Sequence, residues 1–220
     1  MDIKGFPLEG LKVLDLSRVL AGPFATRMLS DLGADVLKIE PPEGDVTRHF
    51  GKSDTGVAGF YLQQNIGKRN VCIDLKADGA RELVLDLCRE ADMLVENFRP
   101  GVMDRNNIGY EALSKINPGI IFGFGSGFGS SGPNVHKGGQ DVLAQAMTGT
   151  MARKADPSHP LAIYPTALCD YSAGMHLVQG ILAALLQRQK TGRGQQVEVS
   201  LYDSMIAMQM QEAAMHMYSG

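Results

Sequence analysis

Short apolar segments alternate with helical patterns along the first half of the chain, and this alternation constrains the fold more than any other feature of the sequence. The stretches between the apolar segments carry apolar side chains at helical spacing, as Phe24, Met28 and Leu32 do. Strands that are joined through helices pair in parallel, by right-handed crossovers. We therefore expect an α/β fold with a doubly wound, parallel, Rossmann-like sheet. The predicted strands are residues 12–16, 36–39, 70–75, 93–95, 120–124 and 196–200.

Proline and glycine indicate where several of the helices begin and end. Pro23 can open the first helix and Gly33 can close it. Further helices are expected over 79–90, 141–151 and 171–190, and from residue 201 onward. The connection over residues 41–69 shows no clear period, and loops of that length are usually functional or contain small elements.

Composition excludes several classes of protein. A chain of 220 residues with 44% hydrophobic and 20% charged residues suits a globular α/β domain. The net charge of −3 argues against nucleic acid as a main partner. The longest apolar run, residues 181–186, is far shorter than the roughly 20 residues of a membrane helix. No signal peptide is visible, and the three cysteines lack metal spacing. We expect a cytoplasmic protein without a metal or a membrane partner.

The C-terminal segment is unusually rich in methionine. Five of the 12 methionines lie between Met205 and Met217, in a predicted apolar helix. Such a helix needs a partner surface to cover it. We interpret residues 1–200 as a ligand-binding and catalytic domain. Residues 201–220 are then a helix leading toward a second domain that this chain lacks.

Polar side chains follow the ends of the predicted strands. In a doubly wound sheet, ligands bind beyond the carboxyl ends of the strands. Arg18 follows the first strand, Lys76 the third, and Asn97 to Arg99 the fourth. Cations at this edge suit phosphates or carboxylates. For any one of them, a merely solvated side chain is an equally good interpretation.

A glycine-rich run follows the fifth predicted strand. Residues 127–132 match the pattern G-x-G-x-x-G, but Pro133 follows in place of a helix, and the first strand has no such pattern after it. Dinucleotide sites need the pattern between the first strand and its helix. We therefore expect no nicotinamide site, and interpret the run as a mobile loop or a place where the backbone approaches a ligand closely.

Asp170 directly precedes a long predicted helix, where it would act as the N-cap. Helix N–H groups would then keep its carboxylate ionised near neutral pH. An ionised, partly desolvated carboxylate can attack a thioester carbonyl and form a covalent intermediate. The histidines offer no metal spacing, and no G-x-S-x-G elbow is present.

Five ordered motifs run through nearly the whole chain: LKVLDLSRVLAGP (11–23), LGADVLKIE (32–40), VENFRPG (95–101), CDYSAGMH (169–176) and TGRGQQVEVSLYDS (191–204). On these motifs the chain resembles the class III coenzyme A transferases, the CaiB–BaiF family. The family includes formyl-CoA transferases, carnitine CoA-transferases and α-methylacyl-CoA racemases. The resemblance implies an interlocked homodimer that acts on an acyl-CoA and a small carboxylic acid, with CoA as substrate and no tightly bound cofactor.

The resemblance also implies roles for individual residues. The family's catalytic aspartate falls on Asp170, which would attack the acyl-CoA to give a mixed anhydride and then an aspartyl-CoA thioester. An incoming carboxylate would collect the CoA. The family's CoA contacts fall on Arg18, Val19, Leu75, Lys76, Asn97, Phe98, Val102, Arg105 and Lys137.

Gln140 bears on the reaction type. The racemases have an acid/base histidine at this position, and a glutamine cannot exchange a proton near neutral pH. The formyl-CoA transferases have a glutamate there and a glutamine in place of Leu20, so the match to formyl and oxalate substrates is weakened. We favour a CoA-transferase with Asp170 and Gln140 as catalytic candidates. The alternatives are a racemase-like enolate chemistry and an inactive CoA-binding fragment, because the family's second half and its glycine-rich lid are missing.

Overall fold

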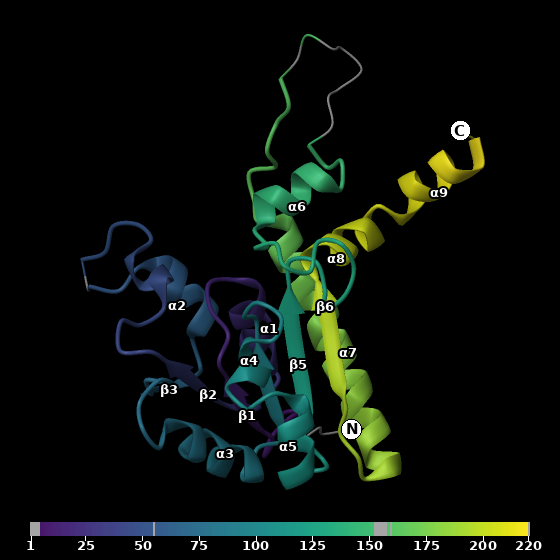
Figure 1. Cartoon of the computed structure of the whole chain (residues 1–220). Helices are drawn as coiled ribbons and strands as arrows, with labels where there is room; N and C mark the ends of the chain where they lie inside the picture. The colour runs from purple at the N-terminus through teal and green to yellow at the C-terminus, as the bar shows by residue number, and fades with distance from the viewer. Residues whose placement is uncertain (1–4, 55, 152–157, 159, 220) are drawn as a thin grey trace.

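The computed structural model describes residues 5–54, 56–151, 158 and 160–219. Within these residues a six-stranded sheet has the order β3-β2-β1-β4-β5-β6, and every neighbouring pair is parallel (Figure 1). This is the Rossmann order, in which β2 and β3 are added on one side of β1 and the later strands, from β4 onward, on its other side. The structure confirms the expected doubly wound fold. The strands are β1 (Lys12–Asp15), β2 (Asp35–Glu40), β3 (Arg69–Cys72), β4 (Met93–Glu96), β5 (Ile121–Ser126) and β6 (Gln196–Ser200).

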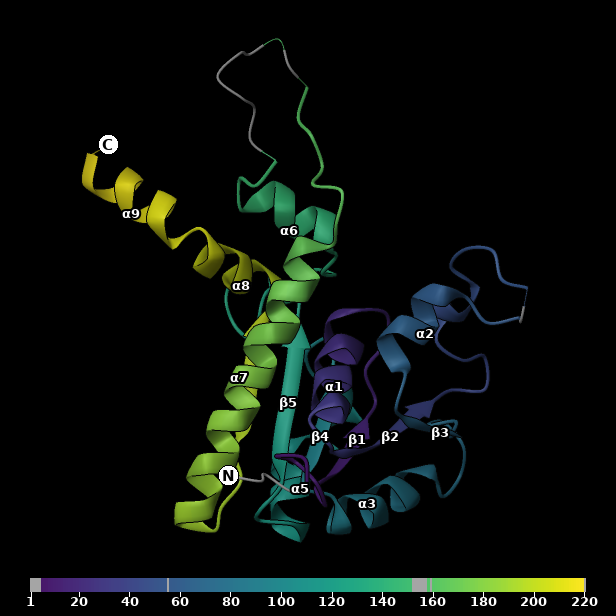
Figure 2. The same cartoon turned by 180° about the vertical axis from the view of Figure 1, so that it is seen from behind.

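Helices cover both faces of the sheet, and strand residues alternate between the two cores. Val13 of β1 packs in the core beneath α1 and α7, whereas the next residue, Leu14, packs in the core beneath α3 and α5. Figure 2 shows α7 running along the sheet on the same side as α1. The helices are α1 (Ala21–Asp31), α2 (Gly59–Asn65), α3 (Ala80–Glu90), α4 (Val102–Arg105), α5 (Tyr110–Ile116), α6 (Asp141–Met147), α7 (Leu168–Thr191), α8 (Leu201–Met208) and α9 (Met210–Ser219), with a 3-10 turn η1 at Val46–His49.

The long helix α7 lies very close to strand β5, next to the edge strand β6. A Cβ atom built on Gly123 would lie 3.1 Å from the Ile181 side chain and 3.4 Å from that of Leu177. Glycine therefore lets the helix approach the strand at this point. The approach fixes the axis of α7 relative to the carboxyl edge of the sheet, and so fixes where the start of the helix lies.

Several element boundaries differ from the sequence-based expectations. The strand expected over 70–75 ends at Cys72, although the N–H of Ile73 still donates to the Glu40 carbonyl oxygen. The connection over 41–69 contains η1 and α2. The helix expected over 141–151 ends at Met147, because Gly149 takes a left-handed φ of 81° just beyond it. The helix expected from 201 is divided at Gln209 into α8 and α9.

The C-terminal helix α9 projects from the body of the domain (Figure 1). It has no buried residue, and Met210 and Met217 are 68% and 83% exposed. The apolar character expected from the sequence is thus on the surface of this chain. The division at residue 200 and the second domain stay predictions. Among the described residues, no helix is long and apolar enough to cross a membrane.

Candidate active site

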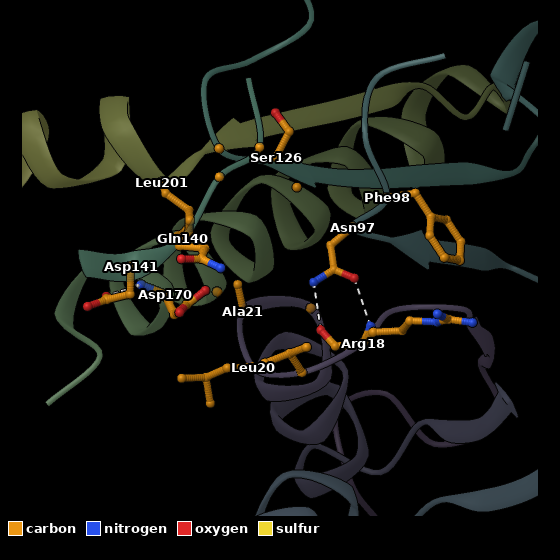
Figure 3. A pocket seen from close by; sticks show the side chains of 18 of the residues that line it. Arg18, Leu20, Ala21, Asn97, Phe98, Ser126, Gln140, Asp141, Asp170 and Leu201 are labelled. Atoms are coloured by element: carbon orange, nitrogen blue, oxygen red, sulfur yellow. Dashed lines mark hydrogen bonds between the residues drawn. The ribbon is translucent and has the colours of Figure 1, made fainter. Parts of the chain in front are cut away.

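A cavity of about 700 Å³ opens at the carboxyl edge of the sheet, between the loops that follow β1 and β4 (Figure 3). Its walls come from the loop after β1, the start of α1, the loops after β4 and β5, and the starts of α6 and α7. Volumes of this size hold cofactor-sized ligands. The sequence-predicted residues that line it are Arg18, Val19, Asn97, Phe98, Lys137, Gln140 and Asp170.

The remaining predicted CoA contacts lie on the same edge of the sheet but outside the lining of this cavity. Leu75 and Lys76 follow β3, and the Lys76 side chain is exposed. Val102 and Arg105 lie in α4, beyond β4. Their role in CoA binding stays a prediction.

Asn97 joins the loop after β4 to the loop after β1. Its Oδ1 accepts a hydrogen bond from the Arg18 N–H at 2.7 Å, and its Nδ2 donates to the Arg18 carbonyl oxygen at 2.8 Å (Figure 3). The Arg18 guanidinium lies 5.6 Å from the centre of the Phe98 ring, within cation–π range. Arg18 therefore forms one wall of the cavity with Asn97 and Phe98, which lie about 80 positions further along the chain.

Asp170 lies in the first turn of α7, and the expectation that it is the N-cap is wrong. The helix begins at Leu168 with Ala167 as N-cap, whose side chain makes no capping hydrogen bond. Asp141 from α6 supplies the cap: its Oδ1 accepts from the N–H groups of Cys169 and Asp170 at 2.7 and 3.1 Å. The Asp170 carboxylate is thereby free of local capping and faces the cavity (Figure 3).

The environment of Asp170 raises its pKa to about 7. Burial is the largest cause and the nearby Asp141 carboxylate the second, while a hydrogen bond from the Ala21 backbone N–H acts in the opposite direction. The expectation of a carboxylate held ionised by its own helix is therefore wrong, because Asp141 occupies the capping position. Asp170 instead changes charge near neutral pH.

Gln145 stabilises the junction between α6 and α7. Its Nε2 donates to Asp141 Oδ2 at 2.5 Å, and its Oε1 accepts from the Tyr164 N–H at 2.9 Å. Beside this junction, burial and the nearby Asp141 and Asp170 raise the pKa of the Cys169 thiol to about 12. Cys169 therefore stays neutral at physiological pH, and Asp170 is the stronger candidate nucleophile.

Two glycines form a backbone crossing at the cavity wall. A Cβ atom on Gly127 would lie 2.3 Å from the Gly139 Cα, and one on Gly139 would lie 2.2 Å from the Gly127 Cα. The close approach expected for the glycine-rich run is thus, at Gly127, an approach to another backbone segment. Gln140 follows the crossing directly and lines the cavity as the N-cap of α6.

A buried charged cluster beneath the β1–α1 loop was missed by the sequence reasoning. Lys68 Nζ lies 2.9 Å from Asp15 Oδ2, and Lys38 Nζ lies 3.5 Å from Asp45 Oδ2; all four side chains are at most 1% exposed. Burial alone would raise the pKa of Asp15, but Lys68, Lys38 and two hydroxyl groups hold it well below its usual range. Charged residues inside apolar strands, such as Asp15 and Lys38, were the available signal.

A second buried acid lies behind Phe98. The Glu96 carboxylate accepts the Phe98 N–H at 2.6 Å, and burial, with a contribution from Asp104, raises its pKa to about 8. Glu96 packs on the opposite side of the sheet from Asp170. Asp170 in the cavity and Glu96 outside its lining therefore both titrate close to neutrality, and any pH dependence has two candidate sources.

A carboxylate that titrates near neutrality, in a ligand-sized cavity at the switch point of a Rossmann-order sheet, defines a class of α/β protein. In that class the carboxylate is placed to act as a nucleophile or as an acid and base. In the described part of the chain, no group of three or more potential metal ligands gathers.

Comparison with known proteins identifies the family. The model of CoA-transferase family III matches residues 8–220. The chain is 43% identical over 211 residues to acetyl-CoA:oxalate CoA-transferase of Acetobacter aceti, covering 95% of this chain and 54% of that protein. It is 42% identical over 202 residues to formyl-CoA:oxalate CoA-transferase of Escherichia coli, covering 91% and 49%. The chain belongs to CoA-transferase family III, which confirms the resemblance seen in its motifs.

Solved structures agree with this assignment. A CaiB/BaiF family protein from Brucella suis matches with a TM-score of 0.93 and 38% identity, over 99% of this chain and 59% of that one. A hypothetical protein from Mycobacterium tuberculosis matches with a TM-score of 0.92 and 34% identity, over 98% and 60%. The chain spans about half the length of the curated relatives that it matches.

Proposed function

We propose that this chain is the CoA-binding and nucleophile-bearing part of a family III CoA-transferase. The whole protein would move CoA between an acyl-CoA and a small carboxylic acid. The observation that carries the proposal is the Asp170 carboxylate, with a pKa of about 7, in the cavity at the switch point of the sheet. The names of the relatives, which are CoA-transferases acting on oxalate, support the reaction class.

The reaction would proceed through covalent intermediates on Asp170. The ionised carboxylate attacks the thioester carbonyl of the acyl-CoA, the C–S bond breaks, and a mixed anhydride and the CoA thiolate form. The thiolate then attacks the Asp170 carbonyl carbon, which releases the first acid and leaves an aspartyl-CoA thioester. The second acid repeats both steps in reverse order, takes up the CoA and restores the Asp170 carboxylate.

The chain supplies three aids to these steps. Partial burial raises the basicity of Asp170, which makes the ionised form a better nucleophile than an ordinary carboxylate. The Ala21 backbone next to the same carboxylate favours its ionised form, which is the nucleophile. Arg18 and Lys137 line the cavity and suit the phosphates of CoA.

Gln140 separates transfer from racemisation. Its amide lines the cavity but does not titrate near neutral pH, so Gln140 does not supply an exchanging group for two-base racemisation. We assign Gln140 a hydrogen-bonding role toward the acyl group or the incoming acid.

Chemical trapping tests the proposal. We expect the protein, incubated with acetyl-CoA and then hydroxylamine, to carry a hydroxamate at Asp170 that peptide mass spectrometry detects. Asp170→Asn is the matched control and should carry none. CoA binding without any adduct would support the inactive-fragment alternative. Rapid deuterium uptake at the α-carbon of a 2-methylacyl-CoA in heavy water would support the racemase.

We also propose that the whole protein works as a homodimer in the cytoplasm, with the apolar surface of α9 covered by a second domain or subunit. The exposed methionines of that helix support the covering. Cys72, Cys88 and Cys169 are unpaired thiols, which suits a reducing compartment.

A further inference from the structure

Val19 adopts a backbone conformation that is costly for its residue type. Its φ is 67°, in the left-handed region, where the branched Cβ of valine crowds the backbone. Val19 also lines the cavity, between Arg18 and the start of α1. Such conformations persist only where neighbouring groups impose them, so the groups that hold Val19 shape the cavity.

Asp45 holds Val19 from beneath. Its Oδ2 accepts a hydrogen bond from the Val19 N–H at 3.1 Å, while its Oδ1 accepts from the N–H and the hydroxyl of Thr47 at 3.0 and 2.8 Å. The Asp45 side chain is fully buried and does not line the cavity. Both oxygens thus accept from donors, an arrangement that a carboxylate satisfies and an amide does not.

Lys38 fixes the carboxylate and the other end of the loop together. Its Nζ lies 3.5 Å from Asp45 Oδ2 and donates to the Ser17 carbonyl oxygen at 2.7 Å. The lysine side chain is 1% exposed, so its charge requires the buried acids around it. Asn97 forms two hydrogen bonds with the Arg18 backbone. Three consecutive residues, 17–19, are therefore each bonded to a different side chain, from Lys38, Asn97 and Asp45.

We propose that Asp45, supported by Lys38, is a positioning residue for CoA binding, which acts by imposing the left-handed conformation of Val19. This inference rests on the proposed function, since it assigns CoA as the ligand of the loop. Without Asp45, Val19 would relax toward negative φ and displace Arg18 on one side. On the other side it would displace the Ala21 N–H that meets Asp170.

A double-mutant experiment tests the proposal with CoA as the probe. Asp45→Asn keeps the shape of the side chain but places an amide donor against another donor. We expect its dissociation constant for CoA, measured by calorimetry, to rise about tenfold. Glycine adopts positive φ without steric cost. In a Val19→Gly background, whatever affinity the lost valine side chain itself costs, adding Asp45→Asn should therefore change the dissociation constant by less than about twofold.

The control is Asp92→Asn. Asp92 is a partly exposed acid at the opposite edge of the sheet, and it pairs with Arg188 at 2.9 Å. It should lower the melting temperature while leaving CoA affinity unchanged. Unchanged affinity in Asp45→Asn, or an equally large effect of Asp45→Asn in the Val19→Gly background, would overturn the role of Asp45. A wild-type protein that does not bind CoA would instead refute the proposed function, and with it the ligand of this loop.

Hydrogen exchange adds a measurement that needs no variant. Val19 is 40% exposed, yet its N–H donates to a buried carboxylate. We expect the Val19 amide of the wild-type protein to exchange far more slowly than an unbonded loop amide. Rapid exchange of this amide in the folded protein would show that Asp45 does not hold the loop, even if Asp45→Asn fails to fold.

Discussion

The Asp141 carboxylate accepts the backbone N–H of Asp170 at 3.1 Å, so one acid caps the helix that carries the other. The cap brings a second negative charge close to the Asp170 carboxylate. That charge, added to burial, raises the pKa of Asp170 to about 7. The capping residue thus helps to position the candidate nucleophile and, after burial, is the second cause of its raised pKa.

The pH dependence of covalent chemistry follows from this pKa. Only the ionised carboxylate attacks a thioester, so the rate of hydroxamate formation at Asp170 should rise with pH and reach half its maximum near pH 7. Rates measured by mass spectrometry between about pH 5 and pH 9 check this. Glu96→Gln is the matched control for the second buried acid, and should leave the midpoint in place. A midpoint near the ordinary value of 3.8 would contradict the burial of Asp170.

Asp141→Asn should shift that midpoint to lower pH. The amide keeps an acceptor oxygen for the helix N–H groups but removes the neighbouring charge. Asp141→Ala should shift it as well and also lower the free energy of unfolding by about 1 kcal/mol, through loss of the cap. The same trapping experiment, with urea unfolding alongside, separates charge from capping. Identical midpoints in wild type and Asp141→Asn would leave burial as the whole cause.

The stability of the protein should depend on the charge of Asp170. The folded state keeps a proton on this residue up to about pH 7, whereas the unfolded chain releases it near 3.8. The folded state binds more protons between these values, so the free energy of unfolding falls as the pH rises through this window. Asp170→Asn should therefore exceed wild type in stability at pH 8 by roughly 1–4 kcal/mol, and by much less at pH 4. Equal differences at both pH values would contradict this.

Cations that line the cavity should contribute to CoA affinity. We expect Arg18→Ala and Lys137→Ala each to weaken CoA binding by roughly 1–3 kcal/mol, the cost of losing a charge-assisted hydrogen bond. Lys76→Ala and Arg105→Ala test the predicted contacts outside the cavity in the same titration. Lys12→Ala is the control, because this lysine pairs with Glu90 far from the carboxyl edge. If all four variants bind as wild type does, the phosphates lie elsewhere.

The exposed apolar surface of α9 should drive self-association of this chain. Met210 and Met217 are 68% and 83% exposed, and apolar patches on monomers are usually small. Replacing both by glutamate should shift the mass seen in size-exclusion light scattering toward the monomer. A monodisperse wild-type monomer would remove the reason for a covering domain or subunit.

The alternation of apolar segments and helical patterns was enough to predict the sheet. The strands predicted at residues 12–16 and 36–39 agree with β1 and β2 to within one residue at each end. Both are short apolar segments, as expected for strands that are buried on both faces of a sheet. The rule of right-handed crossovers predicted parallel pairing, whereas the strand order β3-β2-β1-β4-β5-β6 came from the structure alone. Helix starts were harder, since the cap of α7 comes from Asp141, 29 positions before Asp170.

The residues that line the cavity were easier to predict from the sequence than the buried residues that support them. Arg18 and Asn97 follow strand ends, so their positions marked them, whereas the catalytic role expected of Asp170, which lies in the first turn of α7, came from the resemblance. Asp45 lies in a connection without periodicity, and its proposed role depends on its hydrogen bond with Val19, 26 positions away. Such pairs arise only when the fold brings distant segments together, and a single sequence does not encode them locally.

The backbone crossing of Gly127 and Gly139 has a consequence for how this protein can vary. Because Gly127 and Gly139 are in contact, residues 128–138 form a loop that is closed at its base, and the tip of the loop lies beyond the crossing. The loop can gain or lose residues at its tip without moving Gln140, which directly follows the crossing. Any side chain at either glycine would instead force the base apart and carry Gln140 with it. Gly127 and Gly139 thus separate the tip of the loop, where insertions are tolerated, from Gln140 at the cavity wall.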